Sequence, residues 1–238
     1  MDKEQILGFD VCTYSKKELL SNIVKDYLNG EKNFVVNINP EIIMTNYKNN
    51  KIKSEFNKQK YQIPDGSGVI LASKRKKGKL KERITGIDLM LKICETMQEY
   101  PAKIFLYGSK KDIANKAKEE LNIMYPKVNI VETCDGYCDE SIAIEKINKS
   151  HADILFVGLG SPKQEKFIME NKDKLKSIKI FMPIGGSLDV ISKTKKRAPK
   201  WMQKNNLEWL YRLIKEPKRI FRQCKLFKFI WLVIINKK

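Results

Sequence analysis

The chain has 238 residues, of which 47 are Lys or Arg and 28 are Asp or Glu, and its formal net charge is +19. This length suffices for one sizeable domain, or for a domain with an appendage, and excludes any need for a disulfide scaffold. Five cysteines with no signal peptide before them indicate reduced thiols and a cytoplasmic protein. His151 is the only histidine, and Cys134 and Cys138 are four residues apart, so we expect no metal site.

The positive charge is concentrated in two regions. Residues 193–238 contain fifteen Lys or Arg and only two acids, Glu208 and Glu216, and a second basic cluster lies at residues 74–83. Such asymmetry indicates an anionic partner, which could be nucleic acid, an anionic membrane surface or a phosphorylated substrate. The alternative is a well-solvated surface.

The first part of the chain predicts two helices and two strands. A capping-box pattern at Ser15 begins a helix that ends at Gly30, and a buried strand follows at residues 34–36. Asn39 and Pro40 are typical of a cap and first residue of a helix, which we expect to continue to about Asn57. A short strand at residues 61–63 then leads to Asp65.

Helices and strands alternate regularly after the basic cluster. We expect helices at residues 86–99, 112–124 and 140–149, and strands at residues 103–107, 128–132, 154–157 and 178–182. Strands that alternate with helices of ten or more residues predict an α/β fold with a Rossmann-like, mostly parallel sheet covered on both faces.

Glycines follow four of these strands. In parallel sheets, ligands bind at the carboxyl ends of the strands, where glycine lets backbone approach them closely, although ordinary turns have the same composition. The chain lacks a G-x-G-x-x-G motif with a ribose-binding acid and lacks a P-loop, which disfavours a nicotinamide cofactor and a P-loop nucleotide. The candidate ligand-binding glycines are Gly108, Gly158, Gly160, Gly185 and Gly186.

The C-terminal segment predicts a basic helical appendage. Ala198 and Pro199 open a helix that Pro217 ends, and a second helix starts near Lys218. Residues 229–235 form an apolar run of seven, too short to span a bilayer but suited to lying in a membrane interface. The alternative is a terminal helix docked on the core.

Asp65 lies in a Pro-Asp-Gly sequence that permits three interpretations. It is typical of an ordinary turn, and Asp65 could equally cap a helix over residues 66–73. The third interpretation, a catalytic carboxylate, depends on the motifs around it.

Seven spaced motifs together resemble the WecG/TagA/CpsF family of bacterial glycosyltransferases, from about Phe34 to Arg222. They are Asn39-Pro40-Glu41, Pro64-Asp65-Gly66-x-Gly68-Val69, Glu82-Arg83-Ile84-x-Gly86-x-Asp88, Gly158-Leu159-Gly160-x-Pro162-Lys163-Gln164-Glu165, Gly185-Gly186, Arg197-Ala198-Pro199 and Glu208-Trp209-Leu210-x-Arg212-Leu213 with Glu216-Pro217-x-Arg219.

The resemblance implies a membrane-associated, metal-independent, inverting transferase without a cofactor. It would move N-acetylmannosamine (ManNAc) from UDP-ManNAc to N-acetylglucosamine (GlcNAc) on undecaprenyl diphosphate, for wall teichoic acid or a related surface glycan. The alternative donors are UDP-ManNAc uronic acid or another UDP-sugar. The implied location is the cytoplasm, at the inner face of the membrane, with residues 1–192 as the α/β catalytic domain and residues 193–238 as the membrane-docking appendage.

The resemblance also implies roles for individual residues. Asp65 is the candidate base for the acceptor hydroxyl, and the arginines would bind the diphosphates of donor or lipid; those matching family positions are Arg83, Arg212, Arg219 and Arg222. Gln164 faces the pocket in the family, but its capping-box pattern with Pro162 at the first helical position offers a local role. Asn39 also matches a pocket position, whereas Asn37 stands where the family usually has threonine.

Tyr137 and Asp189 are candidates for stacking on and hydrogen-bonding a uracil. The alternatives are packing for Tyr137 and helix capping for Asp189. Two non-enzymatic classes compete with the transferase: a nucleic-acid binder, which the apolar C-terminus disfavours, and a membrane adaptor of the same fold. The sequence also allows a homo-oligomer.

Overall fold

The computed structural model describes residues 2–217 and 220–235, and within α12 the side chains of residues 220–224 are outside the description. Its main sheet has six strands in the order β4-β3-β8-β7-β5-β6. These strands are β3 (Asn33–Ile38), β4 (Tyr61–Pro64), β5 (Lys103–Gly108), β6 (Asn129–Cys134), β7 (Ile154–Gly158) and β8 (Ile180–Pro183). The pairs β3–β8, β8–β7, β7–β5 and β5–β6 are parallel, which confirms the predicted α/β class.

The chain forms two compact units. Unit 1 comprises residues 1–15, 37–85 and 196–238, and unit 2 comprises residues 16–36 and 86–195. The division into residues 1–192 and 193–238 stays a prediction.

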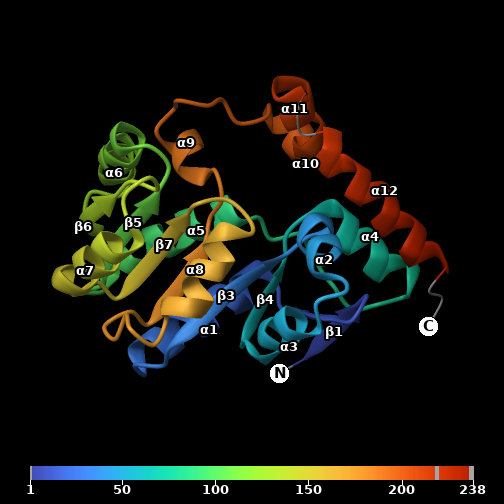
Figure 1. Ribbon diagram of the computed structural model, residues 1–238, viewed down its shortest axis with the longest axis horizontal. Coiled ribbons are helices and arrows are strands. Elements are labelled where there is room, and N and C mark those ends of the chain that lie inside the picture. The colour runs from blue at the N-terminus through green and yellow to red at the C-terminus, as the bar shows by residue number, and fades with distance from the viewer. Residues whose placement is uncertain (1, 218–219, 236–238) are drawn as a thin grey trace. The chain divides into compact units, whose positions relative to one another are not determined.

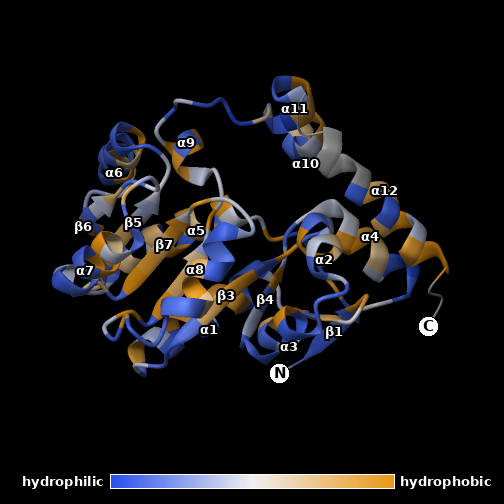
Figure 2. Ribbon diagram, viewed as in Figure 1, coloured by the Kyte–Doolittle hydropathy of each residue, from blue (hydrophilic) through white to orange (hydrophobic). Residues whose placement is uncertain are grey.

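Unit 2 holds most of the parallel sheet and its helices. In Figure 1, α8 lies in front of the sheet and α5 behind it. Residues 154–157 of β7 are apolar and fully buried, as expected for a parallel strand covered on both faces, and Figure 2 shows this strand as hydrophobic. The helices are α1 (Lys16–Leu28), α5 (Gly86–Thr96), the 3-10 turn η1 (Met97–Glu99), α6 (Lys111–Met124), α7 (Glu140–Ser150), α8 (Lys163–Asn171) and α9 (Ser187–Ile191).

Over its described residues, unit 1 contains a small hairpin near the N-terminus, three helices within residues 37–85 and three helices in the C-terminal segment. The antiparallel strands β1 (Lys3–Ile6) and β2 (Phe9–Cys12) were not predicted from sequence. The helices are α2 (Pro40–Asn46), α3 (Asn50–Lys58), α4 (Ser67–Arg75), α10 (Lys200–Lys204), α11 (Glu208–Lys215) and α12 (Ile220–Ile235).

Two helices expected as single elements are each divided. The helix expected from Pro40 to about Asn57 breaks before Asn49, whose Oδ1 accepts the N–H of Ile52 at 3.1 Å and so caps α3 as a new helix. The helix expected to run from Ala198 to Pro217 breaks at Asn206, which has φ +59°, a left-handed conformation in which a right-handed helix cannot continue.

Helix α12 packs one face on helices α2 and α4 of the same unit and exposes its other face. Phe229 is 1% exposed, and Leu232 and Val233 are also buried, against helices α2 and α4. Trp231 and Ile234 are exposed on the same helix. The helix is therefore docked on the core through one face, as the second interpretation expected, and it also has an exposed apolar surface. Among the described residues, no helix has both the length and the apolar character needed to cross a membrane.

Candidate functional site

Asp65 lies where strands β3 and β4 end in unit 1. Its N–H donates to the carbonyl oxygen of Ile38 at 2.9 Å, which fixes the backbone after β4 beside the end of β3. Gly66 follows with φ +119°, a conformation that favours glycine, and it is the N-cap residue of α4. Asp65 therefore does not occupy the capping position of this helix.

Glycine also permits the close approach of α4 to α2 beside Asp65. A Cβ atom at Gly68 would lie 2.6 Å from Cγ of Pro40 and 3.5 Å from the Phe229 ring. The motif Asp65-Gly66-x-Gly68 thus holds the carboxylate against the N-terminal end of α2.

The surroundings of Asp65 shift its protonation. Burial raises the pKa of this carboxyl above its ordinary value, and Glu208 raises it further, while Arg83, Arg212 and a hydrogen bond with Asn39 oppose the increase. Asn39 also caps α2, because its Oδ1 accepts the N–H of Ile42 at 2.9 Å. A carboxylate with a raised pKa next to guanidinium groups is suited to general-base chemistry.

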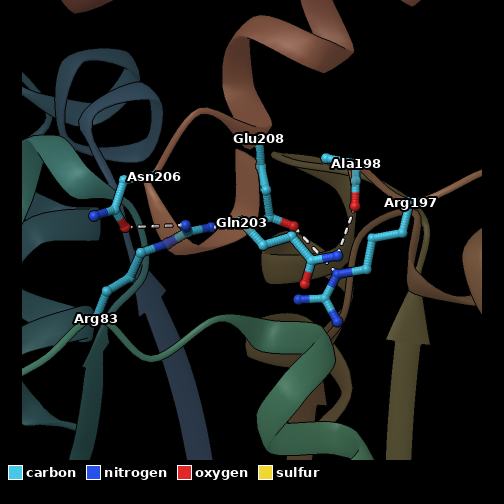
Figure 3. A network of polar contacts seen from close by, with 6 residues as sticks. All are labelled: Arg83, Arg197, Ala198, Gln203, Asn206 and Glu208. Atoms are coloured by element: carbon cyan, nitrogen blue, oxygen red, sulfur yellow. Dashed lines mark hydrogen bonds and ion pairs between the residues drawn. The ribbon is translucent and has the colours of Figure 1, made fainter. Parts of the chain in front are cut away.

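Arg83 is held by a network of polar contacts from the C-terminal segment, shown in Figure 3. Its Nη2 pairs with Oε2 of Glu208, and its Nη1 lies 3.3 Å from Oδ1 of Asn206. Arg197 Nε reaches the other carboxylate oxygen, Oε1 of Glu208, at 3.2 Å. Gln203 Nε2 donates to the carbonyl oxygen of Ala198 at 2.6 Å, which closes this segment on itself.

Glu208 is the main residue that sequence reasoning did not assign to the site. It is only 4% exposed, although it lies in the most basic part of the chain. A signal was present, because Glu208 is one of only two acids in residues 193–238. A buried acid in a basic segment requires a cationic partner.

The remaining candidate residues of unit 1 are Asn37 and the C-terminal arginines. Arg212 is exposed on α11 and contributes to the positive field at Asp65. Asn37 is buried in β3. Arg219 lies outside the described residues, and Arg222 belongs to α12 but its side chain is outside the description.

In unit 2, three neighbouring strands end in closely packed glycines. Gly108 has φ +136°, and a Cβ atom there would lie 2.4 Å from the carbonyl oxygen of Gly158. A Cβ atom at Gly158 would lie 3.0 Å from the carbonyl oxygen of Gly185. Gly160 and Gly186 follow in the adjoining loops. At Gly108 and Gly158, glycine therefore permits close packing of neighbouring strand ends. A Cβ atom at Gly160 or Gly185 would meet nothing within 4 Å, so these two positions leave room for a ligand beside the backbone.

Gln164 connects two of these strand ends. Its Oε1 accepts the N–H of Gly185 at 2.9 Å, and its Nε2 donates to Oε1 of Glu165 at 2.8 Å. The capping-box interpretation is wrong: α8 begins at Lys163, its N-cap is Pro162, and no side chain caps it. Gln164 is 4% exposed and holds the loop after β8 in place.

Tyr137 and Asp189 lie in the loops of the same strand ends. Tyr137 is 78% exposed, which contradicts the packing alternative. Asp189 Oδ1 accepts a hydrogen bond from Ser109 Oγ at 3.3 Å, and the N-cap of its helix is Gly186, so Asp189 does not occupy the capping position of α9. Across the part of the chain that the structure describes, no group of three or more His, Cys, Asp or Glu side chains could hold a metal ion.

Comparison with known proteins finds relatives that match along the whole chain. The chain is 32% identical to the N-acetylglucosaminyldiphosphoundecaprenol N-acetyl-beta-D-mannosaminyltransferase of Bacillus subtilis (strain 168), over 100% of this chain and 93% of that protein. It is 33% identical to the protein of the same name from Staphylococcus aureus (strain MRSA252), over 99% of this chain and 94% of that protein. The profile of the glycosyl transferase WecG/TagA/CpsF family matches residues 4–238. The chain therefore belongs to the WecG/TagA/CpsF family of glycosyltransferases.

Proposed function

We propose that this glycosyltransferase moves ManNAc from UDP-ManNAc to GlcNAc-diphospho-undecaprenol, with inversion at the anomeric carbon and without a metal. The names of its full-length relatives support this acceptor and this sugar. The observation that carries the proposal is the environment of the Asp65 carboxylate. Burial raises its pKa, and the positive charges of Arg83 and Arg212 oppose that increase. The product would be the linkage unit of wall teichoic acid or a related surface glycan.

In this reaction, Asp65 accepts the proton of the acceptor hydroxyl as that oxygen attacks the anomeric carbon. General-base assistance of this kind contributes about 10²–10⁴-fold to the rate. The leaving UDP gains negative charge, and guanidinium groups stabilise such charge through paired N–H donors. Arg83 is assigned to a diphosphate, with Glu208 and Asn206 setting its orientation; the further diphosphate candidates are Arg212, Arg219 and Arg222.

The strand ends of unit 2 are assigned to the nucleotide sugar. The open backbone at Gly160 and Gly185 allows close approach of the donor, while Gly108 and Gly158 permit the close packing of the strand ends beside it and Gly186 lies in the adjoining loop. The exposed ring of Tyr137 is suited to stacking on a uracil, and Asp189 to accepting a hydrogen bond from it. In unit 2, Gln164 is the candidate for a polar contact with the donor. In unit 1, Asn39 and Asn37 are candidates for polar contacts with substrate near Asp65.

The C-terminal helices are assigned to the anionic inner leaflet of the cell membrane, on the cytoplasmic side. Helix α12 exposes large apolar side chains, namely Phe227, Trp231, Ile234 and Ile235. Between α4 and α12 lies a groove of about 380 Å³, whose lining is apolar except for Lys74 and Arg75. Apolar side chains next to cations suit the boundary between acyl chains and anionic headgroups, where each Lys or Arg contributes about 1 kcal/mol.

The test is an assay of the purified protein with a GlcNAc-diphospho-lipid acceptor and a panel of UDP-sugars. We expect a product heavier by one N-acetylhexosamine with UDP-ManNAc, also after treatment with a chelator. A product formed only with the uronic acid donor would reassign the sugar. Absence of a product with every UDP-sugar would contradict the proposal and favour a membrane adaptor. A homo-oligomer stays a prediction, which light scattering of the same sample would check.

A further inference from the structure

Two cysteines flank a short loop at one strand end of unit 2. Cys134 is the last residue of β6, and Cys138 precedes Asp139, the N-cap residue of α7. Their Sγ atoms are 2.8 Å apart, with the thiols reduced. A disulfide bond measures about 2.05 Å, so the two sulfurs need to approach by less than about 1 Å to form one.

The two thiols are not equivalent. Cys134 is 3% exposed, whereas Cys138 is half-buried and accessible to small molecules. Burial, together with the contact with Cys138, raises the pKa of Cys134 to about 12. Cys134 therefore keeps its proton at neutral pH, and either thiol can be the donor in the hydrogen bond between the two sulfur atoms. The accessible sulfur of Cys138 is the one that reacts first.

The loop between the cysteines packs on its neighbours through backbone. The N–H of Gly136 donates to the carbonyl oxygen of Ser109 at 2.7 Å, and a Cβ atom at Gly136 would lie 2.8 Å from the Leu159 side chain. The N–H of Tyr137 donates to Oδ1 of Asp135 at 3.0 Å. A bond between Cys134 and Cys138 would fasten both ends of this loop.

We propose that Cys134 and Cys138 form a redox site that a peroxide oxidises to an intramolecular disulfide, closing the loop of residues 135–137. The sulfur of Cys138 attacks one peroxide oxygen, the O–O bond breaks, and a sulfenic acid and water form. The sulfur of Cys134 then displaces the hydroxyl as a second water, and the S–S bond forms. Two thiols lose two electrons and two protons, and hydrogen peroxide becomes two waters.

Two other cysteines serve as internal controls. Cys12 and Cys94 are 2% and 0% exposed, and burial raises the pKa of both. Neither is within bonding distance of another described sulfur. Buried thiols of this kind are inert towards peroxide under conditions that oxidise an accessible one.

The experiment oxidises the reduced full-length protein with hydrogen peroxide, blocks the remaining thiols with an alkylating agent, and measures the tryptic peptides by mass. Residues 128–146 form one tryptic peptide that contains both cysteines. We expect this peptide to lack both labels, to be lighter by two hydrogens and to regain both labels after reduction. Slower amide hydrogen exchange at residues 136 and 137 is expected in the oxidised form.

Cys138→Ser and Cys134→Ser are the matched variants. Neither should yield an unlabelled, two-hydrogen-lighter peptide, while their peptides containing Cys12 and Cys94 should match those of the wild type. A wild-type peptide that stays fully labelled after oxidation, a disulfide between two chains, or unchanged hydrogen exchange at the loop would overturn the proposal.

Discussion

Arg83 and Glu208 form an ion pair that is largely withdrawn from solvent, with side chains only 16% and 5% exposed. The second oxygen of Glu208 is occupied by Arg197, so one carboxylate holds two guanidinium groups. Because Arg83 precedes α5 and Glu208 begins α11, this contact fixes the orientation of a proposed diphosphate-binding arginine from the C-terminal segment.

Glu208→Gln should lower both stability and transfer activity. The substitution leaves two guanidinium groups without their counter-charge, and breaking a buried ion pair costs about 3–5 kcal/mol. We expect the loss at the lower end of this range, because Arg197 is 23% exposed. Chemical denaturation and the rate of sugar transfer measure the two effects.

Glu170→Gln is the matched control for this substitution. Glu170 pairs with Lys166 at 3.9 Å, and both side chains are more than half exposed. Exposed pairs contribute about 0–1 kcal/mol, so this variant should unfold at nearly the wild-type denaturant concentration. Equal losses in the two variants would contradict the role assigned to Glu208.

The activity should rise with pH through the titration of Asp65. A general base works in its ionised form, and burial raises its pKa, so the half-maximal kcat/KM should lie above the ordinary carboxyl value of 3.8. Glu208 raises the same pKa, so in Glu208→Gln the rise of kcat/KM with pH should occur at lower pH. A pH–rate profile that is identical in the two proteins would exclude the proposed electrostatic coupling.

Much of the fold could be predicted from the sequence because its signals are local. Buried parallel strands are continuous apolar runs, as in β7, and helices are marked by caps such as Asn39. The division between α2 and α3 was missed, although Asn49 belongs to a residue type that is favoured at N-caps and weak inside helices. The hairpin of β1 and β2 was missed because its short strands have no strong alternation.

The candidate site was predictable only in part, for a physical reason. The family resemblance made Asp65, Arg83 and Gln164 candidates, but their partners are set by tertiary contacts. The pairing of Arg83 with Glu208 joins residues 125 positions apart, which no local pattern encodes. The contact of Gln164 with the Gly185 backbone likewise depends on the packing of α8 beside β8.

Gly68→Ala should destabilise unit 1. The added Cβ atom would meet the rigid ring of Pro40 at 2.6 Å, so α4 and α2 must separate. Overpacking of this kind typically costs about 1–3 kcal/mol. Gly186→Ala is the control for stability, because its nearest neighbour is a side-chain oxygen of Asp189 at 3.4 Å and its φ is −85°. A melting temperature of Gly68→Ala equal to that of this control would contradict the close approach.

Replacing Phe227 and Trp231 by serine should weaken binding to anionic vesicles while leaving the fold intact. Both side chains are exposed, at 72% and 58%, so the folded state loses little packing. Fully burying one large apolar side chain is worth about 1.5–3 kcal/mol, so we expect at least a tenfold loss of vesicle affinity. Co-sedimentation with vesicles measures this affinity.

Ile123→Ser is the matched control for membrane binding. Ile123 is also 72% exposed, but it lies on α6 of unit 2, outside the proposed membrane-docking segment. Its substitution should leave vesicle binding unchanged. If it weakens binding as much as the double substitution, a general surface effect rather than α12 is responsible.

The most direct measurement is the rate of ManNAc transfer by Asp65→Asn, compared with the wild type at the same pH and substrate concentrations. The amide cannot accept the acceptor proton, so we predict a decrease in kcat of about 10²–10⁴-fold. The melting temperature should not fall, because burial disfavours the ionised carboxylate that the substitution removes. A variant that folds normally and transfers the sugar within a few-fold of the wild-type rate would contradict the assignment of Asp65 as the base.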